Sequence, residues 1–167
     1  MLSRQKVKAV IDTSFWIHSY RSGLFAYLFD YLDIYVPEAV AHEAMPTIPS
    51  LPTVVLPNVQ LFKLLVRANL IHVKTLTDVP SLAFHVGETE AIALAQQSGY
   101  ALLIDDYEPF MYATQHGIQT LCLADFVVQL NYDKVITLQM ARKHLEALKN
   151  ELRDSLITRA LARLIRI

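Results

Sequence analysis

Short apolar runs alternate with helical patterns along most of the chain. The runs are rich in aliphatic and β-branched residues and stop at polar or turn-forming residues, which is typical of buried strands. They predict strands at 7–11, 33–36, 70–74, 101–104 and 119–121. The stretches between them predict helices that begin at Thr13 and cover about 38–45, 58–68, 88–97 and the residues up to 116. This alternation favours an α/β fold in which helices cover both faces of a mainly parallel sheet.

The length of 167 residues fits one domain spanning 1–167, with a core at about 7–131 and a C-terminal helical region at about 134–167. Four prolines between Pro46 and Pro57 exclude a helix there and predict an extended loop. From Thr137 onward the chain is predicted to be helical, with a leucine stripe at three- and four-residue spacing. That stripe suits packing in a dimer or on a partner protein, while the basic residues around it suit contact with phosphates.

Composition narrows the class of protein further. Hydrophobic residues make up 53% and charged residues 19% of the chain, which excludes a disordered protein. The single Cys122 excludes an internal disulfide framework and a cysteine-rich zinc site, and its apolar neighbours predict a buried thiol. The most apolar stretch, 24–36, contains two aspartates and is too short to span a bilayer, and no signal peptide is visible. We therefore expect a cytoplasmic protein with no membrane partner.

The net charge of −1 conceals a polarised chain. Residues 134–167 carry eight Lys or Arg against three acidic residues, a net charge of +5, so the remainder carries −6. The near-balance of the whole chain lacks the basic excess of most nucleic-acid-binding proteins. The separation of the two charges removes that objection.

Acidic residues follow two of the predicted strands. Asp12 ends the strand at 7–11, and Asp105 and Asp106 end the strand at 101–104. Carboxyl ends of parallel strands share one edge of a sheet, where ligands bind, so these acids meet if the strands are neighbours. A single aspartate there can instead cap the next helix, but two consecutive aspartates repel each other unless a cation or a proton intervenes.

Two predicted helices add further carboxylates. Glu43 follows Val40 and Ala39 on a small apolar face, where a carboxylate needs a partner. Glu88 and Glu90 lie about 200° apart around their helix, so only one of them points inward. Few Lys or Arg residues lie near these segments, so converging carboxylates favour a hard divalent cation such as Mg²⁺ or Mn²⁺. Many enzymes that hydrolyse phosphodiesters use two such ions bound by a cluster of carboxylates.

These acids belong to four motifs, which give the chain a family resemblance. In order, the motifs are Ile11-Asp12-Thr13-Ser14, the run 36–43 that leads to Glu43, the run 87–95, and Leu102-Leu103-Ile104-Asp105-Asp106. In order and approximate spacing over residues 7–123, the chain resembles PIN-domain ribonucleases, and among them the small prokaryotic VapC-like group. The resemblance implies a three-layer α/β/α sandwich with a central mainly parallel sheet, to which this chain adds C-terminal helices.

Carried over position by position, the resemblance implies catalytic, metal-binding acids at Asp12, Glu43, Glu90 and Asp106, with Asp105 as an ambiguous second choice beside Asp106. Ser14 would bond the metal shell or a phosphate, with Thr13 and Glu88 in supporting positions. The implied activity is endoribonucleolytic, with Mg²⁺ or Mn²⁺ as cofactor and RNA as substrate. Many members are toxins of toxin–antitoxin pairs and form dimers, so a homodimer and a cognate antitoxin are expected partners.

The chain also departs from the family pattern. Members often carry Ala-Arg where this chain has Pro109-Phe110, and Ile104 stands where many carry a hydroxyl residue. These departures motivate an alternative, a catalytically inactive PIN-like module that binds RNA or protein. A receiver-type phosphoacceptor also uses acids at strand ends, but this chain has no lysine between Leu76 and Asp133 where such a protein needs one.

Aromatic and imidazole side chains near the acids are candidates for other roles. Tyr107 and Phe110 follow the aspartate pair and are predicted to stack on a substrate base. His42 and His85 flank the candidate acids, but hard-cation sites prefer oxygen ligands, so an exposed or supporting position is expected for both.

Overall fold

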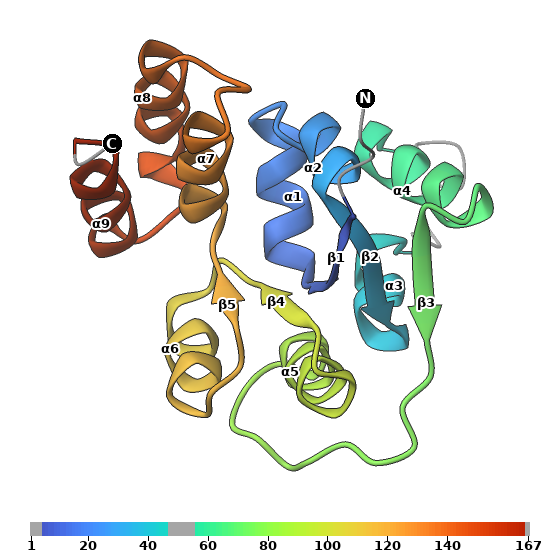
Figure 1. The fold of residues 1–167 in the computed structure, drawn as a ribbon. Coiled ribbons are helices and arrows are strands. Elements are labelled where there is room, and N and C mark those ends of the chain that lie inside the picture. Colours follow the sequence, from blue (N-terminus) through green and yellow to red (C-terminus); the bar gives the residue numbers. More distant parts are fainter. Residues whose placement is uncertain (1–4, 47–55, 166–167) are drawn as a thin grey trace.

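The central element is a parallel sheet whose five strands have the order β3-β2-β1-β4-β5 (Figure 1). The computed structural model describes residues 5–46 and 56–165. The strands are β1 (Val7–Ile11), β2 (Leu32–Pro37), β3 (Ile71–Lys74), β4 (Ala101–Leu103) and β5 (Thr120–Leu121). All five lie within two residues of the predicted ranges, which confirms the α/β class.

Helices connect and cover these strands. They are α1 (Thr13–Arg21), α2 (Phe25–Tyr31), α3 (Glu38–Ala44), α4 (Pro57–Arg67), α5 (Val86–Ser98), α6 (Tyr107–Gln115), α7 (Leu123–Tyr132), α8 (Leu138–Ala147), the 3₁₀ turn η1 (Leu148–Asn150) and α9 (Asp154–Leu164). In Figure 1, α5 and α6 lie on one side of the sheet, and α1, α2 and α7 lie on the other. The predicted three-layer α/β/α arrangement is therefore confirmed. No helix among the described residues has both the length and the apolarity needed to cross a membrane.

The position of β1 determines where the site lies. β1 pairs with β2 on one side and with β4 on the other, with Ala9 opposite both Ile34 and Ala101. Beyond the last pair, the Asp12 backbone N–H donates to the Leu103 carbonyl at 3.1 Å. The acids that follow β1 and β4 therefore lie at the same edge of the sheet, as expected if the two strands are neighbours.

Three features of the fold differ from the prediction or extend it. Helices α2 and α7 were not predicted, because their apolar residues run into the neighbouring strands without a break in the pattern. The region from Thr137 is helical, as predicted, and the structure divides it: α8 ends at Ala147, the turn η1 follows, and α9 begins at Asp154. The predicted loop between Pro46 and Pro57 lies almost wholly outside the described residues, and Pro57 itself opens α4.

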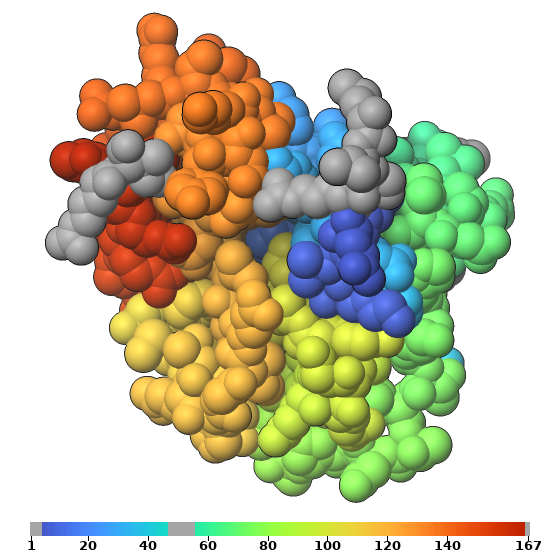
Figure 2. All heavy atoms as spheres, viewed as in Figure 1, coloured from blue at the N-terminus to red at the C-terminus, as the bar shows by residue number. Residues whose placement is uncertain are grey.

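The break between α8 and α9 determines where the leucine stripe packs. Both helices fold back and pack on α7, and Figure 2 shows them (orange to red) packed directly on the rest of the chain. Among the stripe residues, Leu145, Leu148 and Leu152 are buried within the same chain, as is Leu156 of α9. The apolar face formed by these leucines is therefore covered within the chain, while Leu138 at the start of the stripe is exposed. Packing of this region in a dimer or on a partner stays a prediction.

Candidate active site

Asp12 combines a structural and an electrostatic role. It is the N-cap of α1, and its carboxylate accepts hydrogen bonds from the Phe15 backbone N–H at 2.9 Å and from the Ser14 hydroxyl at 2.7 Å. Burial raises the pKa of this carboxyl to about 8, against these two hydrogen bonds and with help from the negative charges of Asp105 and Asp106. The sequence allowed two roles for Asp12, capping of the next helix and membership of a group of acids. The structure shows both.

Asp105 is directed into the layer between α1 and α7. His18 of α1 contacts one of its carboxylate oxygens at 2.8 Å, and the Leu123 backbone N–H at the start of α7 donates to the other at 2.7 Å. Burial raises the pKa of Asp105 overall, although the hydrogen bonds from His18 and Leu123 lower it. Because the Asp105 carboxylate is bound between α1 and α7 and its neighbour Asp106 lines the cavity, the geometry favours Asp106 of the pair as a metal ligand.

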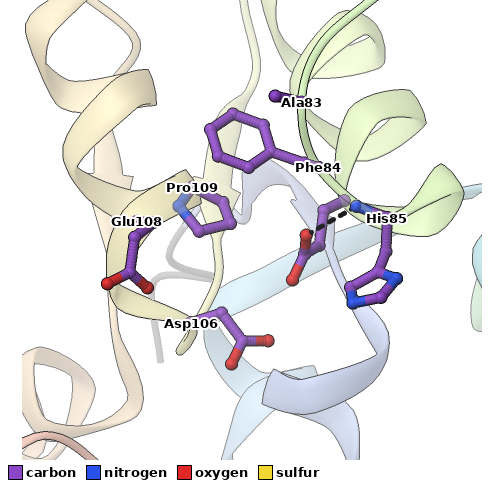
Figure 3. A pocket seen from close by; sticks show the side chains of 7 residues that line it. Ala83, Phe84, His85, Asp106, Glu108 and Pro109 are labelled. Carbon is purple, nitrogen blue, oxygen red and sulfur yellow. Dashed lines mark hydrogen bonds between the residues drawn. The ribbon is translucent and has the colours of Figure 1, made fainter.

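Asp106 opens onto a cavity of about 600 Å³ at the edge of the sheet (Figure 3). It is exposed, whereas Asp105 beside it is buried. The cavity lies between the start of α6 and the segment that leads into α5, and its lining residues are Ala83, Phe84, His85, Glu88, Asp106, Glu108 and Pro109. Figure 3 shows Asp106, Glu108 and Pro109 on one side of this space and Ala83, Phe84 and His85 on the other.

Glu88, and not Glu90, is the acid of α5 that faces this cavity. Burial raises the pKa of Glu88, and the nearby negative charge of Asp106 raises it further, while a hydrogen bond from the His85 backbone N–H lowers it. Glu90 lies on the far side of the helix, where its carboxylate accepts a hydrogen bond from the Ala39 backbone N–H at the start of α3 at 3.0 Å. The geometry therefore favours exchanging the two roles that the sequence suggested, because the helix rotates Glu88 inward and leaves Glu90 to bond α3.

Glu43 lies at the same edge, held between α1 and α5. Its carboxylate accepts hydrogen bonds from the Thr13 hydroxyl at 2.6 Å and from the Gly87 backbone N–H at 3.2 Å. A Cβ atom placed on Gly87 would lie 2.5–2.7 Å from this carboxyl group, so a side chain there would displace the Glu43 carboxylate from its present position. Thr13 thus links Glu43 to Asp12, its neighbour along the chain.

The aromatic residues predicted to stack on a substrate are covered by the C-terminal segment. Phe110 is only 2% exposed, and the Arg159 guanidinium lies over its ring at 5.0 Å from the centroid. The Arg153 guanidinium lies over the half-buried Tyr107 ring at 4.3 Å. The prediction for Phe110 is contradicted, because α9 folds back over it, and Tyr107 has a cation on its face. His42 is exposed, and His85 lines the cavity.

Sequence reasoning missed three residues of this region. His18 holds Asp105, Gly87 makes room for Glu43, and Phe84 lines the cavity. Gly87, the glycine before Glu88, was a usable signal. Glycine lowers the stability of a helix, so its presence inside one often indicates that another group packs closely there. His18 and Phe84 had no signal, since each meets the site only through the fold.

Comparison with known families identifies the family of this chain. A family model described as DUF3368, a PIN domain, matches residues 8–165. The chain belongs to the PIN-domain family. PIN domains are typically nucleases and commonly use divalent metals. No match to this PIN domain was found among curated proteins.

Two solved structures are similar to this PIN domain. One is a PilT N-terminus domain protein from the hyperthermophilic archaeon Sulfolobus solfataricus P2, with 13% identity, a TM-score of 0.49, and coverage of 71% of this chain and 89% of that chain. The other is a domain of a functionally unknown protein from Methanocaldococcus jannaschii DSM 2661, with 16% identity, a TM-score of 0.49, and coverage of 70% and 91%.

The donor chemistry of the site suits the metals that this family uses. Asp12, Glu43, Glu88 and Asp106 present only carboxylate oxygens, the ligands that Mg²⁺ and Mn²⁺ prefer. Burial is the main cause of the raised pKa values of Asp12 and Glu88, and the negative charge of Asp106 raises both further. Among residues 5–46 and 56–165, however, no three acidic, histidine or cysteine side chains lie at the spacing of a single ion. The fully converged cage expected from the sequence is therefore not formed.

Proposed function

We propose that this PIN domain is a metal-dependent endoribonuclease that hydrolyses RNA phosphodiester bonds. The observation that supports it is the pair formed by Glu88 and Asp106. The two carboxylates border one cavity at the carboxyl edge of a parallel sheet, close enough that the charge of Asp106 raises the pKa of Glu88. Two carboxylates in mutual repulsion around an open cavity form a cation site in a protein whose family typically cleaves nucleic acid.

Four acids would hold Mg²⁺ or Mn²⁺ in this proposal. Asp106 and Glu88 bind from the two sides of the cavity, Asp12 binds from the end of β1, and Glu43 binds beside it through the Thr13 link. When bound, these metals supply Lewis acidity, lower the pKa of water and neutralise charge that develops on a phosphate. The chain's own contribution is to fix the carboxylates: the Ser14 hydroxyl and the Phe15 N–H orient Asp12, and Gly87 and Thr13 orient Glu43.

A matched pair of variants tests which acid of α5 takes part. Glu88→Gln removes a carboxylate from the cavity, and Glu90→Gln makes the same change on the opposite side of the helix. We expect Glu88→Gln to lower Mn²⁺-dependent cleavage of single-stranded RNA at least about 100-fold, because a lost ligand removes several kcal/mol of transition-state stabilisation. Glu90→Gln should stay near the wild-type rate, since its amide oxygen can still accept from the Ala39 N–H. Initial rates are measured over a Mn²⁺ titration, with melting curves as a check on folding.

The reverse result would return Glu90 to the metal-binding role suggested by the sequence. Full activity of both variants would contradict any metal role for α5. A wild-type protein that binds RNA but cleaves none with Mg²⁺ or Mn²⁺ would contradict the nuclease and favour the alternative, a PIN-like binding module. The homodimer, the cognate antitoxin and the toxin role stay predictions from the family resemblance.

A further inference from the structure

The cavity beside Glu88 and Asp106 has an apolar wall that the proposed hydrolysis does not use. Ala83 and Phe84 line it from the segment before α5, and Pro109 lines it from α6 (Figure 3). The cavity volume of about 600 Å³ falls within the range of about 300–1,000 Å³ for pockets that bind small organic groups. One space therefore offers both a set of carboxylates and a surface on which a flat apolar group can pack.

Phe84 is held in a defined orientation within this wall. Its ring meets the Tyr112 ring of α6 edge to face, with centroids 5.4 Å apart and planes at 72°. The side chain is half-buried, so its inner part is fixed by packing while another part borders the cavity. An aromatic ring held in this way loses little conformational entropy when a ligand packs on it.

The charge of the lining selects which part of a nucleotide can lie against this wall. The described residues that line the cavity include three carboxylates and no Lys or Arg; Glu108 is paired with Arg153 from outside the lining at 3.3 Å, which leaves Glu88 and Asp106 as its negative charges. A phosphate is repelled by such a lining, except where cations bound by Glu88 and Asp106 attract it. The uncharged, flat part of a nucleotide is its base, and bases bind to aromatic side chains by stacking.

We propose that Phe84 is a base-binding residue, on which the base next to the scissile phosphate packs, opposite Pro109. The inference rests on the proposed nuclease function and adds a requirement to it. A base inside a duplex presents its faces only to its stacking neighbours, so it must be unpaired and turned outward to reach Phe84. The substrate is then a single-stranded region of RNA, read at one nucleotide through its base and at the next phosphate through the acids.

Removing single bases from the RNA tests this contact directly. A short fluorescein-labelled single-stranded RNA and a series of the same RNA with one abasic nucleotide at each position are bound to wild-type protein and to Phe84→Leu. Calcium replaces Mn²⁺ to slow cleavage. Phe84→Leu keeps an apolar side chain against Tyr112 but removes the stacking face. We expect it to weaken binding of the intact RNA about 5- to 100-fold. One abasic position should weaken wild-type binding similarly and leave the variant unchanged, because both changes remove the same contact.

Two further variants separate stacking from a purely structural role of Phe84. Phe84→Trp restores an aromatic face and should recover affinity. Leu82→Ala is the matched control, since Leu82 is a half-buried apolar residue of the same segment outside the cavity; it should leave RNA affinity unchanged. Equal losses in Leu82→Ala and Phe84→Leu, or additive losses at every abasic position, would overturn the proposal.

The outcomes also distinguish this proposal from the nuclease proposal. Cleavage by wild-type protein together with unaltered RNA affinity in Phe84→Leu would overturn the base contact and leave the nuclease standing. The expected abasic pattern in a protein that cleaves no RNA would support the base contact and contradict the nuclease. An equal loss of affinity for duplex and single-stranded RNA in Phe84→Leu would overturn the requirement for an unpaired base.

Discussion

At the scale of single residues, the end of β1 is a place of unbalanced charge. Asp12 and Asp105 are both buried beside the exposed Asp106. Asp105 has His18 as a partner: burial on its own lowers the pKa of that imidazole, but the hydrogen bond to Asp105 and the charges of Asp105 and Glu151 raise it overall. Asp12 accepts hydrogen bonds from neutral groups, the Ser14 hydroxyl and the Phe15 backbone N–H. Folding therefore holds Asp12 where its negative charge is unfavourable.

This arrangement predicts how Asp12 affects the pH dependence of stability. The pKa of Asp12 is about 8 in the folded, metal-free protein and about 4 in the unfolded chain, so the folded state binds more protons between those pH values. Stability then falls as pH rises from about 4 to about 8. Asp12→Asn should remove this part of the fall and be more stable than wild type at about pH 8, by at least about 1 kcal/mol. The raised pKa of His18 also makes the protein less stable as pH rises, and the charge of Asp12 is the last of its causes, so Asp12→Asn reduces this contribution as well.

Urea denaturation in EDTA, at about pH 5 and about pH 8, measures the effect. Parallel stability profiles for wild type and Asp12→Asn would show that the Asp12 carboxyl has an ordinary pKa in the folded protein. Unaltered Mn²⁺-dependent RNA cleavage by the variant would separately contradict the metal role of Asp12.

At the scale of elements, one buried carboxylate holds the C-terminal helix in place. Asp125 of α7 pairs with Arg159 at 2.6 Å and Arg163 at 2.8 Å, both from α9, and also accepts a hydrogen bond from the Cys122 backbone N–H. Arg153, just before α9, pairs with Glu108 at the cavity. Several charges of the basic region are therefore matched within the chain, which leaves fewer of them for RNA phosphates than the sequence alone suggested.

Asp125→Asn should loosen α9 from α7. The change removes two charge-assisted contacts, but the arginine side chains are 41% and 51% exposed and can be hydrated in part. We therefore expect a loss of about 1 to 3 kcal/mol in the free energy of unfolding, measured by urea denaturation. The matched control is Glu146→Gln, which breaks the exposed Glu146–Lys149 pair of the same region and should cost less than about 0.5 kcal/mol. Equal losses in the two variants would show that Asp125 does not anchor α9.

At the scale of the whole molecule, the candidate acids and the basic C-terminal helices belong to different parts of the fold. The candidate acids lie at the carboxyl edge of the sheet, while the basic C-terminal helices pack on α7, where Asp125 binds Arg159 and Arg163. A divalent cation that binds only the folded state stabilises it by mass action, about 2.7 kcal/mol at a hundredfold excess over the dissociation constant. A cation bound at the proposed site would therefore couple metal binding to folding.

The coupling predicts a metal-dependent melting temperature. At about pH 8, saturating Mn²⁺ should raise the wild-type melting temperature by about 5–10 °C, as expected for a domain of this size. Asp106→Asn should abolish most of the shift, whereas Glu108→Gln should retain it, because Glu108 lines the same cavity but pairs with Arg153. Differential scanning calorimetry with and without Mn²⁺ gives the values. A shift that survives in Asp106→Asn would contradict the proposed site.

Much of this arrangement followed from the sequence alone. Alternating apolar runs located the strands, and the rule that parallel strands share a carboxyl edge placed Asp12 with Asp106. The apolar neighbours of Cys122 indicated a buried thiol, which the structure confirms. The four motifs identified the family, which the family match confirms. These inferences depend on local sequence patterns, on the topology of parallel sheets and on resemblance to a family. None of them needs knowledge of atomic contacts.

The tertiary structure decided the rest, because periodicity shows which residues share a face but not what that face meets. The resemblance assigned Glu90 to the metal and Glu88 to a supporting position, and only the fold showed that Glu88 lines the cavity while Glu90 bonds the Ala39 N–H. The leucine stripe was apolar in either case, and only the fold showed that α7 of the same chain covers it. Phe84 gained its place beside the acids from packing on Tyr112, a residue distant in the sequence. The sequence by itself determined the class of fold and the chemistry available; long-range packing determined which side chains present it.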